Sequence, residues 1–187
     1  FFRYSSEGDQ KQFARKEDMN YWLPADLYMI GVEHTVLHCL YSRFFTKFLF
    51  DKGIINFDEP FNKMRHMGTI LGPDGRKMSK RWGNVINPND EIDKYGADTL
   101  RTYEMFMGPL EDPKPWNDRT ENGVFRFLSK VWTSNDKVQP TSDEDKLKQT
   151  RIVNKLVKKV SDDIDNLSFN TAVAKFMEGL NSLNGFN

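Results

Sequence analysis

The sequence predicts an α/β region followed by an all-α region. Two observations lead to this fold class. A short apolar run at 26–30 ends at Gly31 and precedes a long segment with helical periodicity, which is typical of a strand passing into a helix. Prolines and a glycine crowd positions 108–115, where a helix cannot continue, and no strand pattern occurs after 116. Parallel α/β sheets bind ligands where strands pass into helices, so the Gly31 junction is a candidate site.

The first 75 residues contain the expected strands. Residues 1–20 are polar and predict a loop. Over 36–49, apolar residues recur in pairs every four positions, which indicates a helix with a broad apolar face, and Gly53 is placed to end it. Residues 67–71 predict a second strand, and the following turn is Gly72-Pro73-Asp74-Gly75.

The remaining segments are predicted to be helical after a basic loop at 76–81. A helix over 88–95 starts at Asn87-Pro88 and ends at Gly96, and a second helix covers 97–107. Helices over 117–132, 142–166 and 170–183 follow, with a loop at 138–142. Their predicted capping residues are Asn117, Ser142 and Asn170.

Composition narrows the possible function classes. The 187 residues carry 27 basic and 27 acidic side chains, and 38% are hydrophobic, which is enough for a core. No apolar stretch reaches the roughly 20 residues of a membrane span, so we expect no membrane partner. The single cysteine, Cys39, excludes a disulfide framework and a multi-cysteine zinc site, and it fits a reducing, cytoplasmic location.

Charge is unevenly distributed although its total is zero. Residues 61–82 contain six bases and one acid, whereas residues 83–121 contain nine acids and four bases. The basic part indicates a phosphate or nucleic-acid partner, or else an ordinary solvated surface. Within it, Lys77-Met78-Ser79-Lys80 places two flexible point charges where they can fold over a polyphosphate.

A second constellation is Glu33-His34-x-x-x-His38. On a helix, positions four apart share a face, so the two imidazoles are expected to be neighbours. Three interpretations remain open from the residues: a metal site, a packed and hydrogen-bonded histidine pair, or the wall of a ligand pocket at a helix start. No third metal ligand is evident, since the only other histidine is His66, and we predict no bound metal.

Several blocks of the sequence resemble one family. Lys77-Met78-Ser79-Lys80-Arg81 resembles the KMSKS loop of class I aminoacyl-tRNA synthetases. Within that class, the sequence is similar to the leucyl-tRNA synthetase family at Tyr21–Tyr28, at Gly31–His38, and in the blocks 94–101 and 105–111. The resemblance continues through 126–132 and 166–172. It departs from the family at Arg81, where serine is usual, and at Trp82.

The resemblance implies ATP-dependent activation of leucine and its transfer to tRNA(Leu), with Mg²⁺ arriving on ATP. Tyr28, His34 and His38 would line the leucine side-chain pocket. Gly31 and Glu33 would approach the ribose, and Met67 and Gly68 the adenine. The loop residues Met78 and Ser79 would complete the ATP site, in which Lys77 and Lys80 would be the catalytic pair that holds the triphosphate.

The resemblance also implies a domain organisation. Residues 1–75 would be the second half of a Rossmann-type catalytic domain, 76–115 the KMSKS loop with a connecting helical region, and 116–187 the start of a helical anticodon-binding domain. The expected tRNA-facing bases are Lys148, Arg151, Lys155, Lys158 and Lys159. Apolar residues of this region, including Trp116, Phe125, Trp132, Val160, Ile164 and Phe176, are expected to form its core.

The chain starts with Phe1 instead of methionine, and no HIGH signature occurs in it. We therefore expect this chain to be a piece of a longer enzyme. Its expected partner is the amino-terminal half of that enzyme, and without this half the chain is expected to be inactive. The alternative is a stand-alone RNA-binding helical module with a basic loop. Tyr28 and the two histidines favour the enzyme, because such a module has no use for a small buried polar pocket.

Overall fold

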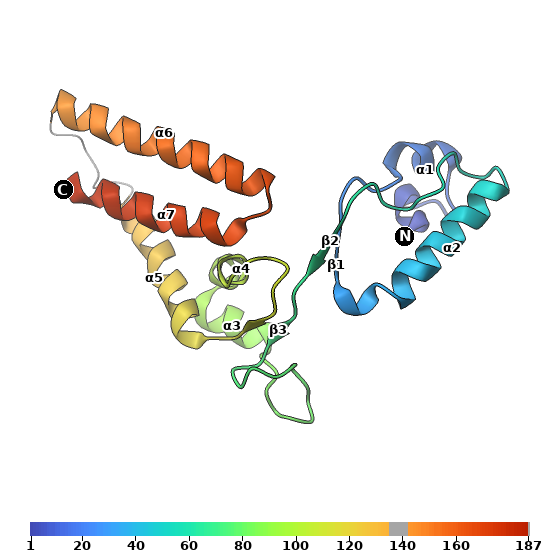
Figure 1. Ribbon diagram of the computed structural model, residues 1–187, viewed down its shortest axis with the longest axis horizontal. Coiled ribbons are helices and arrows are strands. Elements are labelled where there is room, and N and C mark those ends of the chain that lie inside the picture. The colour runs from blue at the N-terminus through green and yellow to red at the C-terminus, as the bar shows by residue number, and fades with distance from the viewer. Residues whose placement is uncertain (135–141, 187) are drawn as a thin grey trace. The chain divides into compact units, whose positions relative to one another are not determined.

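The computed structural model describes residues 1–134 and 142–186. The chain is mostly helical and forms two compact units, Phe1–Gly68 and Thr69–Asn187 (Figure 1). Each unit contributes one strand pair to the described part of the chain, and both pairs are parallel. An α/β region followed by helices is thus confirmed in its coarse form. The three predicted domain segments follow a different division and stay predictions.

The first unit packs short elements around a small apolar core. Its elements are η1 (Phe2–Ser6), α1 (Lys16–Trp22), β1 (Tyr28–Gly31), η2 (Val32–His34), α2 (Leu37–Asp51) and β2 (Met64–Met67). Phe2, Ala14, Met19 and Ile55 are buried together. The loop predicted over 1–20 is wrong where η1 and α1 form. Phe2 and Met19 lie far apart in a polar stretch, and their burial stabilises these two short helices.

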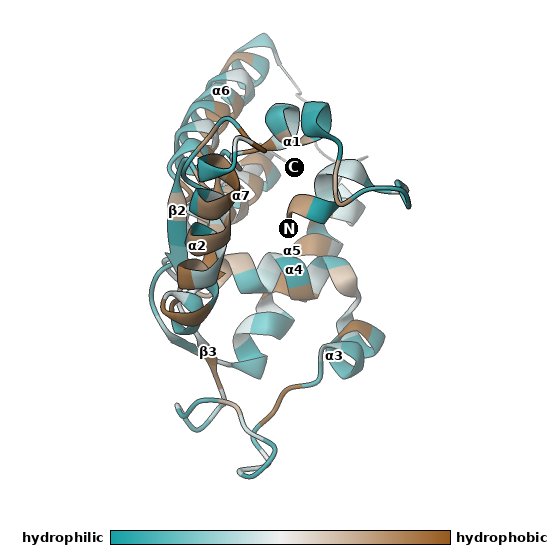
Figure 2. Cartoon of the chain, turned by 90° about the vertical axis from the view of Figure 1, so that its right-hand side faces the viewer, coloured by the Kyte–Doolittle hydropathy of each residue, from teal (hydrophilic) through white to brown (hydrophobic). Residues whose placement is uncertain are grey.

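Helix α2 has the predicted length but turns an unexpected side inward. Its buried residues are Cys39, Ser42 and Thr46. The hydroxyl groups need no outside partner, because Ser42 donates to the Cys39 carbonyl and Thr46 donates to the Ser42 carbonyl. The large apolar residues lie on the exposed side, visible as brown positions along α2 in Figure 2. They include Leu37, Leu40, Tyr41, Phe44, Phe45 and Phe48.

The single strand predicted over 67–71 is wrong. Two strands occur instead, β2 and β3 (Ile70–Leu71), and they belong to different units. β2 pairs with β1, whereas β3 pairs with β4 (Lys114–Pro115). The apolar pattern continues across the break, so the sequence did not reveal that the pairing partner changes at Gly68.

The second unit is built from helices around β3 and β4. Its helices are α3 (Pro88–Tyr95), α4 (Ala97–Phe106), α5 (Asp118–Ser134), α6 (Asp143–Asp165), α7 (Phe169–Leu183) and η3 (Asn184–Phe186). α6 and α7 run side by side (Figure 1). A core of Leu100, Tyr103, Trp116 and Val124 joins α4 and α5, and Ile70 packs against it from β3.

Most predicted helix boundaries in this unit are confirmed. The Asn87 side chain accepts a hydrogen bond from the Asn89 amide, and the Ser142 hydroxyl accepts one from the Asp145 amide. The Asn117 side chain accepts from the Arg119 amide at 3.0 Å. Asn170 is not a cap, because α7 begins at Phe169. The loop predicted over 138–142 lies outside the described residues, apart from Ser142.

The predicted core of this region is only partly correct. Trp116 and Val160 are buried, but Trp132 is 86% exposed, and Phe125, Ile164 and Phe176 are exposed as well. Two of these side chains, Ile164 and Phe176, line an open apolar groove of about 540 Å³ on α4, α5, α6 and α7. Helical periodicity selects the apolar residues, but it does not say which of them another element covers.

Candidate active site

A hydrogen bond joins β1 to α2 in the first unit. The Tyr28 hydroxyl lies 2.7 Å from Nε2 of His38, which is in the first turn of α2. The Tyr28 ring also stacks on Phe61, with ring centroids 4.0 Å apart and an interplanar angle of 3°. These contacts fix both rings, so Tyr28 and His38 form one wall. Phe61 was missed from the sequence, because it lies 33 positions beyond Tyr28 and carries no motif of its own.

His34 is placed differently from the prediction. It belongs to the turn η2, and α2 begins only at Leu37, so the two histidines do not share one α-helix. The His34 side chain is exposed, whereas His38 is half-buried. The structure therefore places His38, and not His34, against Tyr28.

His38 also borders an apolar cavity. The cavity measures about 550 Å³ and is lined mainly by aromatic rings from η1 and α2, including Phe2, Tyr41, Phe45 and Phe48. The cavity offers an apolar surface beside the His38 imidazole, which suits a small ligand with an apolar part. Tyr28 and His34 do not line it.

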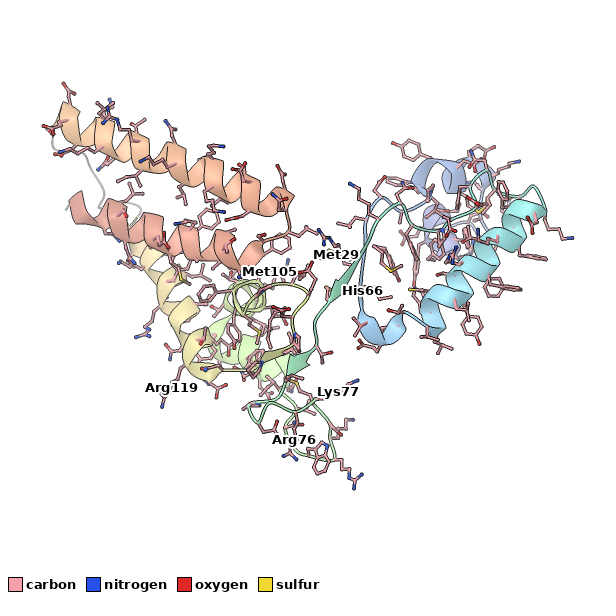
Figure 3. All side chains as sticks on the ribbon, in the orientation of Figure 1. Met29, His66, Arg76, Lys77, Met105 and Arg119 are labelled. Carbon is pink, nitrogen blue, oxygen red and sulfur yellow. The ribbon has the colours of Figure 1, made fainter. Side chains whose placement is uncertain are left out.

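The carboxyl ends of β1 and β2 meet at one edge of the first unit's sheet. The parallel register pairs Gly31 with Met67, and Gly68 follows directly. Met29 and His66, labelled in Figure 3, lie on the two strands just before this edge. Glu33 folds back over Gly31, since a Cβ added at Gly31 would lie 2.5 Å from Oε2 of Glu33. A side chain at position 31 would therefore displace this carboxylate.

The predicted basic loop follows β3 in the second unit, where Figure 3 labels Arg76 and Lys77. A backbone bridge pairs Leu71 with Lys77 at the start of the loop. Met78 packs against the α4–α5 core, whereas Lys77 and Lys80 are exposed. Met78 therefore anchors the loop on the core, and the ammonium groups of Lys77 and Lys80 are exposed and can bind an anion.

Asn84 organises the loop from its far end. Its Oδ1 accepts a hydrogen bond from the Ser79 amide at 2.9 Å, and its Nδ2 donates to Asp74 at 3.0 Å. The Asn84 amide, followed by the Arg76 backbone amide, holds the pKa of the Asp74 carboxyl below its usual value. Gly72 is required here, because a Cβ at that position would lie 2.7 Å from Nδ2 of Asn84. Sequence reasoning gave Asn84 no role in the loop, although an asparagine after Gly83 is a common turn signal.

The five predicted RNA-facing bases are all exposed on α6. Three of them form ion pairs within the helix: Lys148 with Glu144, Lys158 with Asp162, and Lys159 with Asp163. The pairs of Lys148 and Lys158 are exposed on both sides, so they contribute little to stability and exchange readily for another anion. Lys159 differs, because its partner Asp163 is buried. Lys155 and Lys159 also line a groove of about 480 Å³ between α6 and α7.

The residues predicted to contact leucine and adenosine lie in the first unit, and the lysine loop and the α6 bases lie in the second. Among residues 1–134 and 142–186, no group of three or more histidine, cysteine or acidic side chains is arranged to hold a metal ion. Over the same described residues, no helix is both long and apolar enough to cross a membrane.

Residues 5–112 match the family model of class I tRNA synthetases for isoleucine, leucine, methionine and valine (I, L, M and V). The chain belongs to this family. Its curated relatives include leucine–tRNA ligases: one from Borrelia turicatae (strain 91E135) is 41% identical over 98% of this chain, and one from Leptospira biflexa serovar Patoc is 45% identical over 97%. The predicted resemblance to the leucine branch is thereby confirmed. The chain spans only 26% and 22% of these two relatives.

Solved structures agree with this assignment. A LeuRS–tRNA–LeuAMS ternary complex from Agrobacterium radiobacter K84 superposes with a TM-score of 0.87 and 32% identity, over 98% of this chain and 26% of that one. A methionyl-tRNA synthetase from Mycobacterium tuberculosis, bound by methionyl-adenylate, has a TM-score of 0.63 and 20% identity, over 88% of this chain and 34% of that one. The second likeness concerns the fold alone.

Proposed function

We propose that this chain is part of a leucine–tRNA ligase and carries one side of its leucine and ATP sites. The observation that carries the proposal is the Tyr28–His38 wall beside the Gly31–Met67 strand edge, in a chain 41–45% identical to leucine–tRNA ligases. In the reaction, a leucine carboxylate oxygen attacks the α-phosphorus of ATP and pyrophosphate leaves. A hydroxyl of the terminal adenosine of tRNA(Leu) then takes the leucyl group, and AMP leaves.

Each proposed role follows from the chemistry of the residue. Tyr28 and His38 shape the apolar leucine pocket. One methylene contributes only about 1–3 kcal/mol to discrimination between substrates, so the pocket must reject other amino acids by its size and shape. Glu33 accepts hydrogen bonds from ribose hydroxyls beside Gly31, where the absence of a side chain leaves room. Lys77 and Lys80 neutralise charge that develops on the leaving pyrophosphate, and Mg²⁺ enters with ATP as part of the substrate.

The tRNA is the proposed partner of the second unit. Lys148, Arg151, Lys155, Lys158 and Lys159 recur at helical spacing along α6, and a row of this kind suits the phosphate backbone of RNA. Contacts to phosphates position an RNA without reading its sequence, so we expect support of the tRNA body and not recognition of bases.

The chain alone is proposed to be inactive. Its relatives are about four times longer, and the HIGH signature does not occur in its 187 residues. Parallel sheets are normally covered on both faces, yet β1 and β2 form a pair of only two strands, and α2 exposes Phe44 and Phe45. These features suit a half of a Rossmann-type domain that is completed by another segment of the enzyme.

The test is amino-acid-dependent ATP–pyrophosphate exchange by the full-length enzyme, with leucine, isoleucine, valine and methionine. We expect exchange driven by leucine, none from the 187-residue chain, and a loss of about 2–4 kcal/mol of transition-state stabilisation in Lys80→Ala. The matched control is Lys11→Ala, which removes an exposed lysine from the first unit. Exchange driven by another amino acid would move the specificity, and no exchange from a folded enzyme would favour the RNA-binding module.

A further inference from the structure

We propose that Trp82 is a positioning residue for the basic loop, because its indole ring gathers the loop's two arginines and keeps Lys77 and Lys80 in place for ATP. The inference rests on the proposed function, since it assigns the loop to the ATP phosphates. It concerns the position at which the sequence departs from the usual loop, Arg81-Trp82.

Trp82 contacts a cation on each side of the lysine pair in sequence. The Arg76 guanidinium carbon lies 4.8 Å from the centroid of the indole ring, and the Arg81 guanidinium carbon lies 5.2 Å from it. The indole is 53% exposed, so apolar burial alone does not hold it. The attraction between the two guanidinium charges and the face of the ring also stabilises the position of the indole.

The contact with Arg76 closes the loop across six positions. Arg76 is itself fixed, because its Nε forms an ion pair with Asp74 at 2.8 Å. Trp82 is fixed from the backbone, where its amide donates to the Ser79 carbonyl at 3.0 Å. The turn before the loop and the turn after it are thus joined through one aromatic ring.

This closure opposes the repulsion between like charges. Four cationic side chains fall within positions 76–81, and no acid lies among them. Without an anion, their mutual repulsion favours an opened loop. The ring holds the two arginines at a fixed place, so the loop is ordered before ATP arrives and less conformational freedom is lost on binding.

The expected effect follows from two exposed cation–π contacts. Their loss in Trp82→Leu should raise the KM for ATP in pyrophosphate exchange by roughly 5- to 30-fold. The KM for leucine should stay unchanged, because leucine is assigned to the first unit. Trp82→Phe keeps an aromatic face and should restore most of the ATP affinity. Trp132→Leu is the matched control, since it removes an exposed tryptophan from α5.

An activity-independent readout accompanies the kinetics. Amide hydrogen exchange over 77–84, measured without ATP in the full-length enzyme, should be faster in Trp82→Leu than in Trp82→Phe, Trp132→Leu or the unmodified enzyme. The inference is overturned if Trp82→Leu leaves both exchange and the KM for ATP unchanged, or if phenylalanine behaves like leucine at this position. If the unmodified enzyme shows no leucine-dependent activity, the proposed function fails, and the amide exchange alone decides whether Trp82 orders the loop.

Discussion

Glutamine at position 121 should stabilise the second unit at alkaline pH and leave it unchanged in acid. Glu121 on α5 is fully buried, and neither of its carboxylate oxygens has a hydrogen-bond partner in the described structure. Burial, and next the charge and proximity of Glu91 on α3, raise the pKa of Glu121 to about 7. Two ionised carboxylates offer no donor, so a hydrogen bond between them exists only while they share a proton. Asp118 opposes ionisation further, and Lys94 favours it.

The magnitude follows from proton linkage. The pKa of Glu121 is about 7 in the folded state against 4.5 as its ordinary value, so the folded protein binds more protons between these two pH values. The contribution of Glu121 to stability is therefore fully present below pH 4.5 and is lost as the pH rises through 7. The interval between the two pKa values corresponds to on the order of 3 kcal/mol. The side chain of Glu121→Gln cannot ionise, so this pH-dependent loss disappears.

The assay is urea unfolding followed by circular dichroism between pH 4.5 and pH 8, on the unmodified chain and on Glu121→Gln. Subtracting the two free energies of unfolding cancels the contributions of other titrating groups. The difference should grow from near zero at pH 4.5 to on the order of 3 kcal/mol at pH 8. The control is Glu17→Gln, an exposed carboxyl on α1. A difference that stays flat with pH, or a variant that is less stable at pH 8, would refute the reasoning.

Three further predictions concern the Tyr28–His38 wall, the packing of α6 on α7, and the cap of α3. His38→Ala in the full-length enzyme should raise the KM for leucine more than the KM for ATP, and equal changes in pyrophosphate exchange would instead indicate a packing role. Gly179→Ala should cost about 1–3 kcal/mol in thermal unfolding, because the added Cβ would lie 2.8 Å from Leu156 of α6, whereas Gly123→Ala, with nothing within 4 Å, should stabilise α5 by about 0.5–1 kcal/mol. Asn87→Ala should lose the α3 cap and about 1 kcal/mol of stability, and an unchanged melting temperature would contradict that.

Local signals predicted most elements of the fold, and their absence explains the failures. Asn87-Pro88 marks the start of α3 because the cap and the fixed proline backbone act within one turn. Helix α1 has no comparable signal, since no side chain caps it and Met19 is its only buried residue. The break after β2 was missed for a different reason: strand pairing is set by partners distant in sequence.

The candidate site was predictable through family resemblance more than through spacing. The pair of histidines suggested one helix face, but α2 begins after His34, and the partner of His38 is Tyr28 on a strand. The motif Lys77–Lys80 located the loop, whereas its closure by Trp82 and Asn84 depends on side-chain geometry that no short pattern encodes.

The exposed aromatic side of α2 should make the chain associate with itself in solution. Helix α2 buries a cysteine, a serine and a threonine and presents phenylalanine rings to water. Its association with another apolar surface therefore lowers the free energy. Preparations of the 187-residue chain should therefore lose monomer as concentration rises, as light scattering would register. A polar substitution at Phe44 should keep a larger fraction of the chain monomeric.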